Sequence, residues 1–242
     1  MSTIFSLDTI PNSLYHPGMH PSAAYLCYVA TLLMILISAP RARANDGVGT
    51  TAFSFINIVP GSRQAAAAGA FSAVAGDVNA LYWNPAALAR LTSGQVTVAF
   101  SSYFKDVQFG FVGYARPLGV DQVVGIGVQY LSFGSFRETS VSDPLGVRSG
   151  TFSAGNMAVT FSYSRPAGDY ASFGFNLKTL HERIQDFSAT ALALDVGAHI
   201  RIPAYRLSAA VVMQHVGYVA SRFVNGRKAP LPSSIRTGIG YR

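Results

Sequence analysis

Three side chains that could do chemistry alternate along one short stretch of the sequence. Asp195, His199 and Arg201 stand an even number of residues apart, so they would share one face of a β-strand. An acid, a base and a cation on one face could support acid–base catalysis, or they could form a hydrogen-bonded network that lines or fills a barrel. The residues that alternate with them are apolar, so the opposite face of this strand could contact lipid, whereas the face with the three polar groups could not. We therefore favour the polar cluster inside a barrel over catalysis.

Other sequence patterns of enzymes are incomplete. His181-Glu182 is followed by Gln185 where a zinc-binding helix would need its second histidine. Gly125 and Gly127 lack the following helix and acidic residue of a dinucleotide site, and no Gly-x-Ser-x-Gly motif occurs. The single cysteine, Cys27, lies in the apolar N-terminal stretch. We expect no catalytic residue, no metal site and no cofactor.

The composition is that of a protein in contact with an apolar environment. Charged residues make up 12% of the chain and hydrophobic residues 50%, and this charged fraction is about half that of a soluble domain. The formal net charge of +7 comes from basic residues that are scattered singly. This pattern argues against nucleic-acid binding and is compatible with weak attraction to outer-membrane lipid and lipopolysaccharide.

The N-terminus has the pattern of an export sequence. Residues 23–39 form an unbroken, mostly apolar run, followed by Ala42-Arg43-Ala44, a typical cleavage pattern. We expect residues 1–44 to be a signal peptide, with a possible true start at Met19. An uncleaved anchor helix is the alternative, because the run is close to spanning length.

Residues 45–94 are expected to contain short helices. Alanine-rich sequence from Ala65 to Ala75 favours a helix with Ser62 as its N-cap, and Asn84 followed by Pro85 predicts the N-cap and first residue of another helix through Leu91. These helices would cap one end of a β-fold or plug a barrel lumen. We favour the plug, because small side chains suit a narrow lumen.

Residues 95–242 alternate with period two in about eight runs, each long enough to cross a bilayer as a strand. One face of each run is apolar, and the other is rich in Gly, Ala and Ser rather than in the Lys and Glu of a soluble sandwich. Short turns at 116–119, 165–169 and 202–204 alternate with longer loops at 134–150, 182–188 and 218–232. We therefore predict an all-β fold, a transmembrane antiparallel β-barrel of an outer membrane.

Several segments, in this order, resemble the PorV/PorQ family within the wider FadL-like outer-membrane barrels. The resemblance covers roughly residues 53–242, with Arg63, Trp83, Asn84 and Pro85 as its N-terminal signature. The segments are Gly61-Ser62-Arg63, Leu81 to Leu88, Phe173 to Lys178, Ala193 to Ala198 and Leu231 to Gly238. Each segment alone is weak, whereas the ordered set is fairly specific.

The resemblance implies one of two roles. PorV-like members act in type IX secretion, where they bind the C-terminal signal domain of cargo and work with a translocon barrel and a sortase-like partner; here the loops 134–150 and 218–232 would contact partners. Other FadL-like members are channels for hydrophobic compounds, which would contact Phe71, Leu81 and Trp83 here. A structural β-domain without transport activity is the third alternative.

The sequence departs from the family at its C-terminus. It ends at Gly240-Tyr241-Arg242, rather than on an aromatic residue, and stops where family members continue with more strands. The chain is either a fragment or a small barrel of about eight strands with a filled lumen. We favour the fragment, so that the FadL-like barrel would be C-terminally truncated here.

Overall fold

A computed structural model describes residues 51–67, 70–119, 121–147, 150–221 and 229–241. Every described residue belongs to one compact unit, Ala44–Arg242. The predicted signal peptide and the alternative start at Met19 thus lie outside the described residues. None of the helices in the described part of the chain is long and apolar enough to span a membrane.

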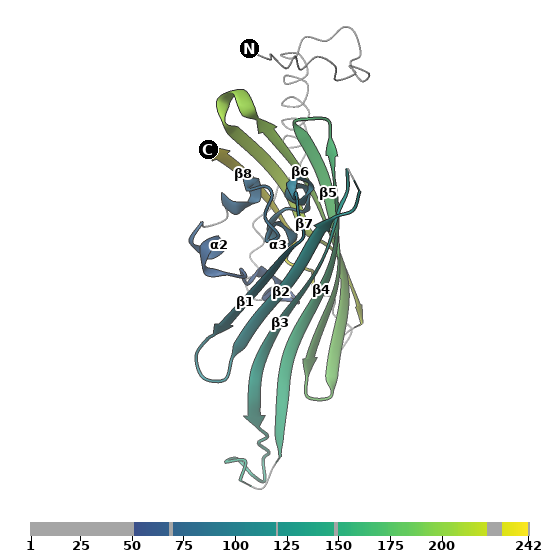
Figure 1. Cartoon of the computed structure of the whole chain (residues 1–242). Helices are drawn as coiled ribbons and strands as arrows, with labels where there is room; N and C mark the ends of the chain where they lie inside the picture. Colours follow the sequence, from purple (N-terminus) through teal and green to yellow (C-terminus); the bar gives the residue numbers. More distant parts are fainter. Residues whose placement is uncertain (1–50, 68–69, 120, 148–149, 222–228, 242) are drawn as a thin grey trace, which may run out of the picture. The chain divides into compact units, whose positions relative to one another are not determined.

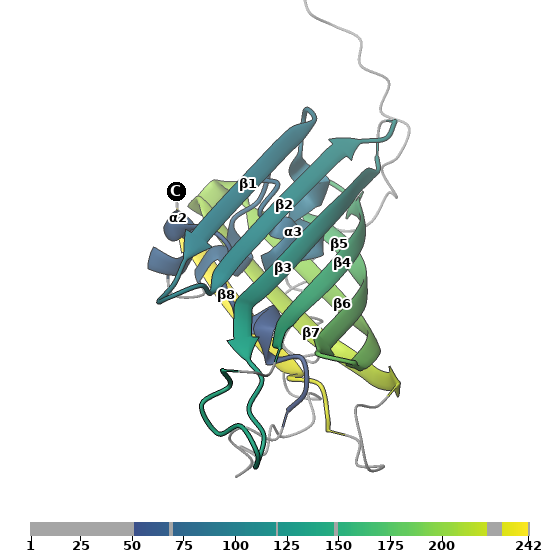
Figure 2. The same ribbon diagram turned by 90° about the horizontal axis from the view of Figure 1, so that it is seen from below.

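Eight antiparallel strands form one sheet in which each strand pairs with its neighbours in chain order. The sheet curls into a half-barrel (Figures 1 and 2), which confirms the all-β prediction and the number of strands. The strands are β1 (Gln95–Ser102), β2 (Gln108–Pro117), β3 (Val123–Arg137), β4 (Thr151–Ala167), β5 (Ala171–Ile184), β6 (Phe187–Ile202), β7 (Leu207–Ser221) and β8 (Ser234–Tyr241).

The two outermost strands each pair with a single neighbour. β1 pairs with β2 and β8 pairs with β7, and no ladder joins β1 to β8 among the described strands. The described residues thus form an open, curled sheet. They do not form the closed eight-stranded barrel that the sequence analysis gave as one alternative.

The connections at the two ends of the sheet differ. The end we call the turn end carries the short connections 118–122, 168–170 and 203–206, the last of which includes η4 (Pro203–Tyr205). The opposite loop end carries the long connections 138–150 and 222–233. The predicted long loop at 182–188 is wrong, because β5 and β6 continue to a turn at Gln185 and Asp186, where Gln185 has a φ of 55°. The polar residues that suggested a loop belong to long strand ends.

The two faces of the sheet have opposite polarity. Every strand exposes apolar side chains on the convex face, whereas the concave face buries polar groups such as Asn176, Asp195 and Gln214. The exposed set includes Val98, Val112, Ile126, Phe161, Leu177, Val196, Met213 and Ile239. The exposed face of this sheet is thus apolar, whereas the solvent-facing side of a sheet in a soluble β-domain is usually polar.

The N-terminal segment lies within the curve of the sheet (Figures 1 and 2). Its short helices are η1 (Ser54–Asn57), α2 (Ser62–Ala66), η2 (Ala70–Ala73), α3 (Ala80–Trp83) and η3 (Pro85–Arg90). The apolar core, which includes Leu81, Leu88, Phe109, Phe111 and Leu180, is buried between this segment and the sheet. The segment therefore packs along the concave face rather than across one end alone.

The helices of this segment differ in part from those predicted. The helix expected through Ala75 ends at Ala66, and its N-cap is Gly61 rather than Ser62. The next described helix, η2, contacts β7 and β8, and such tertiary contacts override the helix propensity of alanine. The second prediction is confirmed at its start, since Asn84 is the N-cap of η3 and its side chain accepts a hydrogen bond from the Ala86 amide. This helix is a 3-10 helix that ends at Arg90.

Candidate functional site

A fully buried ion pair joins β5 and β6 on the concave face. Lys178 Nζ lies 2.7 Å from Asp195 Oδ2, and the two side chains are 5% and 0% exposed. Asp195 also accepts hydrogen bonds from Asn176 Nδ2 at 2.8 Å and from the His215 amide at 2.9 Å. Such a pair is tolerated away from water only when both charges are fully partnered, as the Asp195 carboxylate is here.

A β-bulge in β7 completes this network. The β6–β7 ladder pairs Leu194 with Val216 but Val196 with Met213, so Asp195 stands opposite both Gln214 and His215. The extra residue turns two consecutive side chains inward, and both are 1% exposed. His215 has a φ of 59°, a left-handed conformation that is uncommon for residues other than glycine. The bond from its amide to Asp195 stabilises this backbone geometry.

The state of His215 follows from its neighbours. Its Nδ1 lies 3.3 Å from Lys178 Nζ, and an ammonium group can only donate. As the acceptor of this contact, the ring is a neutral imidazole with its proton on Nε2, which is buried and has no hydrogen-bond partner among the described residues. Asp195 and Lys178 thus form the charged pair, with His215 as a neutral neighbour.

The buried network holds the N-terminal segment through its backbone. Asn176 Nδ2 donates to the Leu81 carbonyl at 3.0 Å, and Gln214 Nε2 donates to those of Tyr82 and Trp83 at 2.8 and 3.1 Å. These three carbonyls are at the C-terminal end of α3, where a helix has no partners of its own for them. We call Asn176, Lys178, Asp195, Gln214 and His215 the clamp, because they hold the end of α3 against the sheet.

The Asn84-Pro85 motif is held beside the clamp. Asn84 is fully buried, and its Nδ2 donates to the carbonyls of Ser72 and Ala198 at 3.1 and 3.3 Å. Two strand glycines make room for the motif. A Cβ at Gly197 would collide with Asn84 Oδ1, and one at Gly174 would lie 2.6 Å from the carbonyl carbon of Pro85. Segments that lie far apart in the sequence thus fit together at this point.

The profile of an Uncharacterised protein family (UPF0164) matches residues 34–191, which is more than half of the chain. The chain belongs to the UPF0164 family. No curated protein matches the sequence. The UPF0164 match includes Asn84, Pro85, Gly174, Asn176 and Lys178, and it ends before Asp195. It thus covers the N-terminal segment and the β5 side of the clamp.

Other predicted signature residues of this UPF0164 chain have different roles. Trp83 is 2% exposed and packs against Tyr82 and Phe71, and the guanidinium of Arg236 on β8 lies 5.0 Å from its ring centroid, a cation–π contact. Arg63 is exposed, 3.4 Å from Asp77 and 5.5 Å from the Phe71 ring centroid. Trp83 is therefore part of the buried packing, whereas Arg63 lies at its edge.

The residues predicted to contact a hydrophobic ligand are packed against protein. Phe71, Leu81 and Trp83 are 3%, 1% and 2% exposed. The cavity beside Leu81 has a volume of about 10 Å³, which is space for no more than about one water molecule. This cavity leaves no room for a hydrophobic ligand beside Leu81, and contact of the three side chains with such a ligand stays a prediction.

The predicted cluster of Asp195, His199 and Arg201 is divided in the structure. Asp195 belongs to the clamp, His199 is hydrogen-bonded through Nε2 to the Ala73 carbonyl at 3.1 Å, and Arg201 is exposed at the turn end. The three share one side of β6, but no hydrogen bond or ion pair joins them in the described structure. The other clamp residues were not predicted as a site. Alternation places Lys178 and Asn176 on a polar face, but nothing in the sequence marks the bulge at Gln214 and His215.

Proposed function

We propose that this protein is an outer-membrane β-barrel protein whose lumen holds its own N-terminal segment, and that it acts in secretion by binding protein partners. The observation that carries the proposal is the exposed, apolar convex face of the sheet. Val98, Phe173 and Leu177 are 69%, 49% and 52% exposed, and similar side chains cover the convex face of all eight strands. In water such a surface would cost about 25 cal/mol per Å², and lipid removes that cost.

An ordered loop at the loop end supports the binding of a protein partner. Between β3 and β4, Val141, Leu145 and Val147 are 102%, 78% and 75% exposed. Asp143 organises this loop, because its amide bonds to Ser140 Oγ and its carboxylate accepts from the Val147 amide, both at 3.1 Å. Apolar side chains held in solvent by a structured loop are typical of interaction sites. Much of the second predicted partner loop, residues 222–228, lies outside the described residues.

Uptake of hydrophobic molecules is less well supported. That role needs an apolar binding space next to the N-terminal segment, and the aromatic residues proposed for it are packed. Two observations instead favour the PorV/PorQ-type role in type IX secretion, with a translocon barrel or cargo C-terminal domains as partners. These are the exposed apolar loop and the sequence resemblance.

Membrane insertion is tested by fractionating Gram-negative cells that express the full chain. We expect the protein in the outer-membrane fraction, resistant to urea washing and with heat-dependent migration on a gel. Phe175→Arg places a charge in the middle of the convex face and should lower the stability of the folded protein in the membrane by about 2–4 kcal/mol. The matched control is Ser188→Arg, on the same face near the loop end, which should lower it by only about 0–1 kcal/mol. Extraction without detergent would instead favour a structural β-domain.

Partner binding is tested with substitutions at the loop end. Val141→Asp together with Leu145→Asp should abolish co-purification of a translocon barrel or of cargo C-terminal domains. Phe104→Asp is the matched control, because Phe104 is 82% exposed on the neighbouring β1–β2 turn. Loss of the partner in all variants alike, or binding of a hydrophobic ligand with no partner, would contradict the secretion role.

A further inference from the structure

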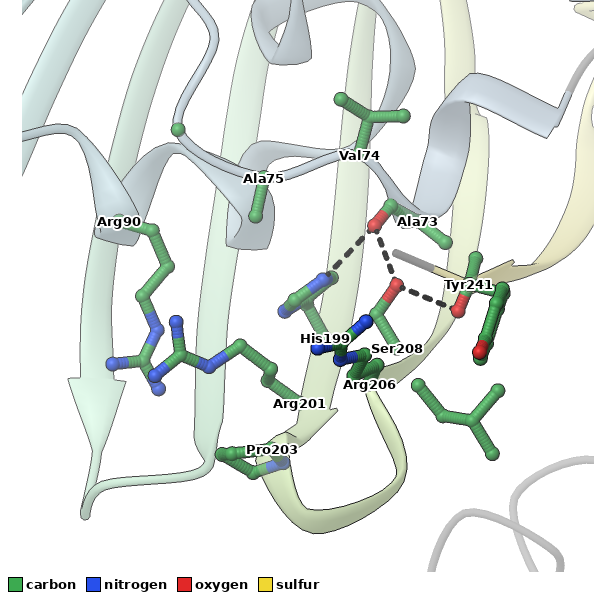
Figure 3. Close-up of a pocket in the computed structure, with 13 residues that line it drawn as sticks. Ala73, Val74, Ala75, Arg90, His199, Arg201, Pro203, Arg206, Ser208 and Tyr241 are labelled. Carbon is green, nitrogen blue, oxygen red and sulfur yellow. Dashed lines mark hydrogen bonds between the residues drawn. The ribbon is translucent and has the colours of Figure 1, made fainter.

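A cavity of about 720 Å³ opens at the turn end of the half-barrel (Figure 3). Its polar wall is formed by three arginines, Arg90, Arg201 and Arg206, together with His199 and Ser208. No acidic residue is among the described residues that line it. Three guanidinium groups thus share a concave space without a carboxylate in its wall. This volume lies in the usual range of small-molecule sites.

The guanidinium groups are only partly satisfied by the protein. Arg90 donates through Nη2 to the Asp169 carbonyl at 2.7 Å, but its buried Nε has no hydrogen-bond partner. In Figure 3 the side chains of Arg90 and Arg201 extend toward one another. Burial, and then the charge of Arg201, lower the pKa of Arg90, while Asp169 acts in the opposite direction. An anion between the two arginines would relieve this repulsion.

His199 and Ser208 form the inner wall beside the arginines. His199 is 1% exposed, its Nε2 bonds to the Ala73 carbonyl, and its Nδ1 has no hydrogen-bond partner. Ser208 Oγ donates to the same carbonyl at 3.1 Å. The hydroxyl and the ring hold η2 in place at this end and leave the guanidinium groups to act on a ligand.

The ligand chemistry follows from charge and shape. Guanidinium groups bind carboxylate and phosphate through paired N–H donors, but three of them exceed what one carboxylate neutralises. A phosphate group offers more charge and a tetrahedral set of oxygens. Val74, Pro203 and Leu207 add an apolar wall, which suits an organic body attached to that group. We propose that this cavity binds the phosphate group of an organic phosphate, either a lipid headgroup or a small phosphorylated molecule.

The proposal stands independently of the role in secretion. If the sheet does span an outer membrane, the short connections of the turn end would face the periplasm. A phosphate site there would lie level with the headgroups of the inner leaflet. A site for a small phosphorylated molecule needs no membrane at all.

The test uses the full chain folded in maltoside micelles, which contain no phosphate. Calorimetric titration with inorganic phosphate should show saturable binding, whereas acetate should bind far more weakly. Arg201→Gln together with Arg206→Gln should weaken phosphate binding by about tenfold or more, because charge-assisted hydrogen bonds are lost. Arg165→Gln, which alters an exposed arginine at the same end but outside the cavity wall, should bind like the unaltered protein.

A second titration with short-chain phosphatidylglycerol distinguishes the two sources. Tighter binding of this lipid than of inorganic phosphate, with the same loss in the double variant, assigns a lipid headgroup. Binding of inorganic phosphate without binding of the lipid assigns a small phosphorylated molecule. Absence of binding by both probes, or equal binding by the double variant and the unaltered protein, would overturn the proposal. Circular dichroism checks that each variant keeps its β-structure.

Discussion

Replacing Lys178 with methionine would leave Asp195 buried and without its cation. The two side chains are 5% and 0% exposed, and Lys178 Nζ lies 2.7 Å from Asp195 Oδ2. Breaking such a buried pair lowers the free energy of unfolding by about 3–5 kcal/mol. Asp195 keeps its bonds from Asn176 and the His215 amide, so we expect a cost near the lower end, about 3 kcal/mol. Asp195→Asn should cost a similar amount, because it leaves the Lys178 ammonium buried beside a neutral amide.

The two changes combined give the sharper measurement. In Lys178→Met with Asp195→Asn no unpaired charge remains, so the double variant should cost at least about 2 kcal/mol less than the two single costs added together. Urea unfolding in detergent micelles can be followed by the fluorescence of Trp83, the single tryptophan, which is 2% exposed. Arg63→Gln breaks an ion pair with side chains 72% and 19% exposed and should cost less than about 1 kcal/mol. Single variants as stable as this control, or strictly additive costs, would refute the account of the clamp.

Two further predictions concern the Asn84-Pro85 motif. Gly197→Ala should destabilise the protein by about 1–3 kcal/mol, because the added methyl collides with Asn84. The control is Gly155→Ala, whose Cβ would meet only the Leu131 carbonyl oxygen at 3.5 Å and whose stability should change by no more than about 0.5 kcal/mol. Equal urea midpoints for the two variants would contradict the close approach of Gly197 to Asn84. Asn84→Ala should lower the free energy of unfolding by about 1–3 kcal/mol. Asn84→Asp should lower it more, although aspartate is a good N-cap, because a carboxylate would face the Ser72 and Ala198 carbonyls. If thermal unfolding shows the aspartate variant to be more stable than the alanine variant, the N-cap bond dominates instead.

The number of strands, and which face of each is apolar, could be predicted because apolar and polar side chains alternate along each strand. The Asn84 N-cap could also be predicted, since its bond to Ala86 is local. The hairpin at Gln185 and Asp186 could not, because exposed polar strand ends have the composition of a loop. The early end of α2 could not either, since local propensity favours a longer helix and contacts with distant strands decide its length.

The clamp was predicted only in part. Asp195 was found by its strand alternation, but its true partners lie on two other strands. Lys178 is on β5, and the His215 amide reaches the carboxylate only because the bulge adds one residue to β7. Register shifts of this kind depend on pairing between strands, and a single sequence does not record them. The predicted grouping with His199 and Arg201 was therefore too local.

The contacts of the N-terminal segment also determine when it can find its place during folding. Gln214 reaches the Tyr82 carbonyl across 132 residues of sequence, and Ser208 reaches that of Ala73 across 135. The strands, in contrast, pair with sequence neighbours through hairpins that close early. The contacts with β7 can form only after that strand has been synthesised, whereas the bond from Asn176 on β5 to Leu81 can form earlier. Until β7 is in place the segment is incompletely packed, and this interval is when the chain depends most on protection from aggregation.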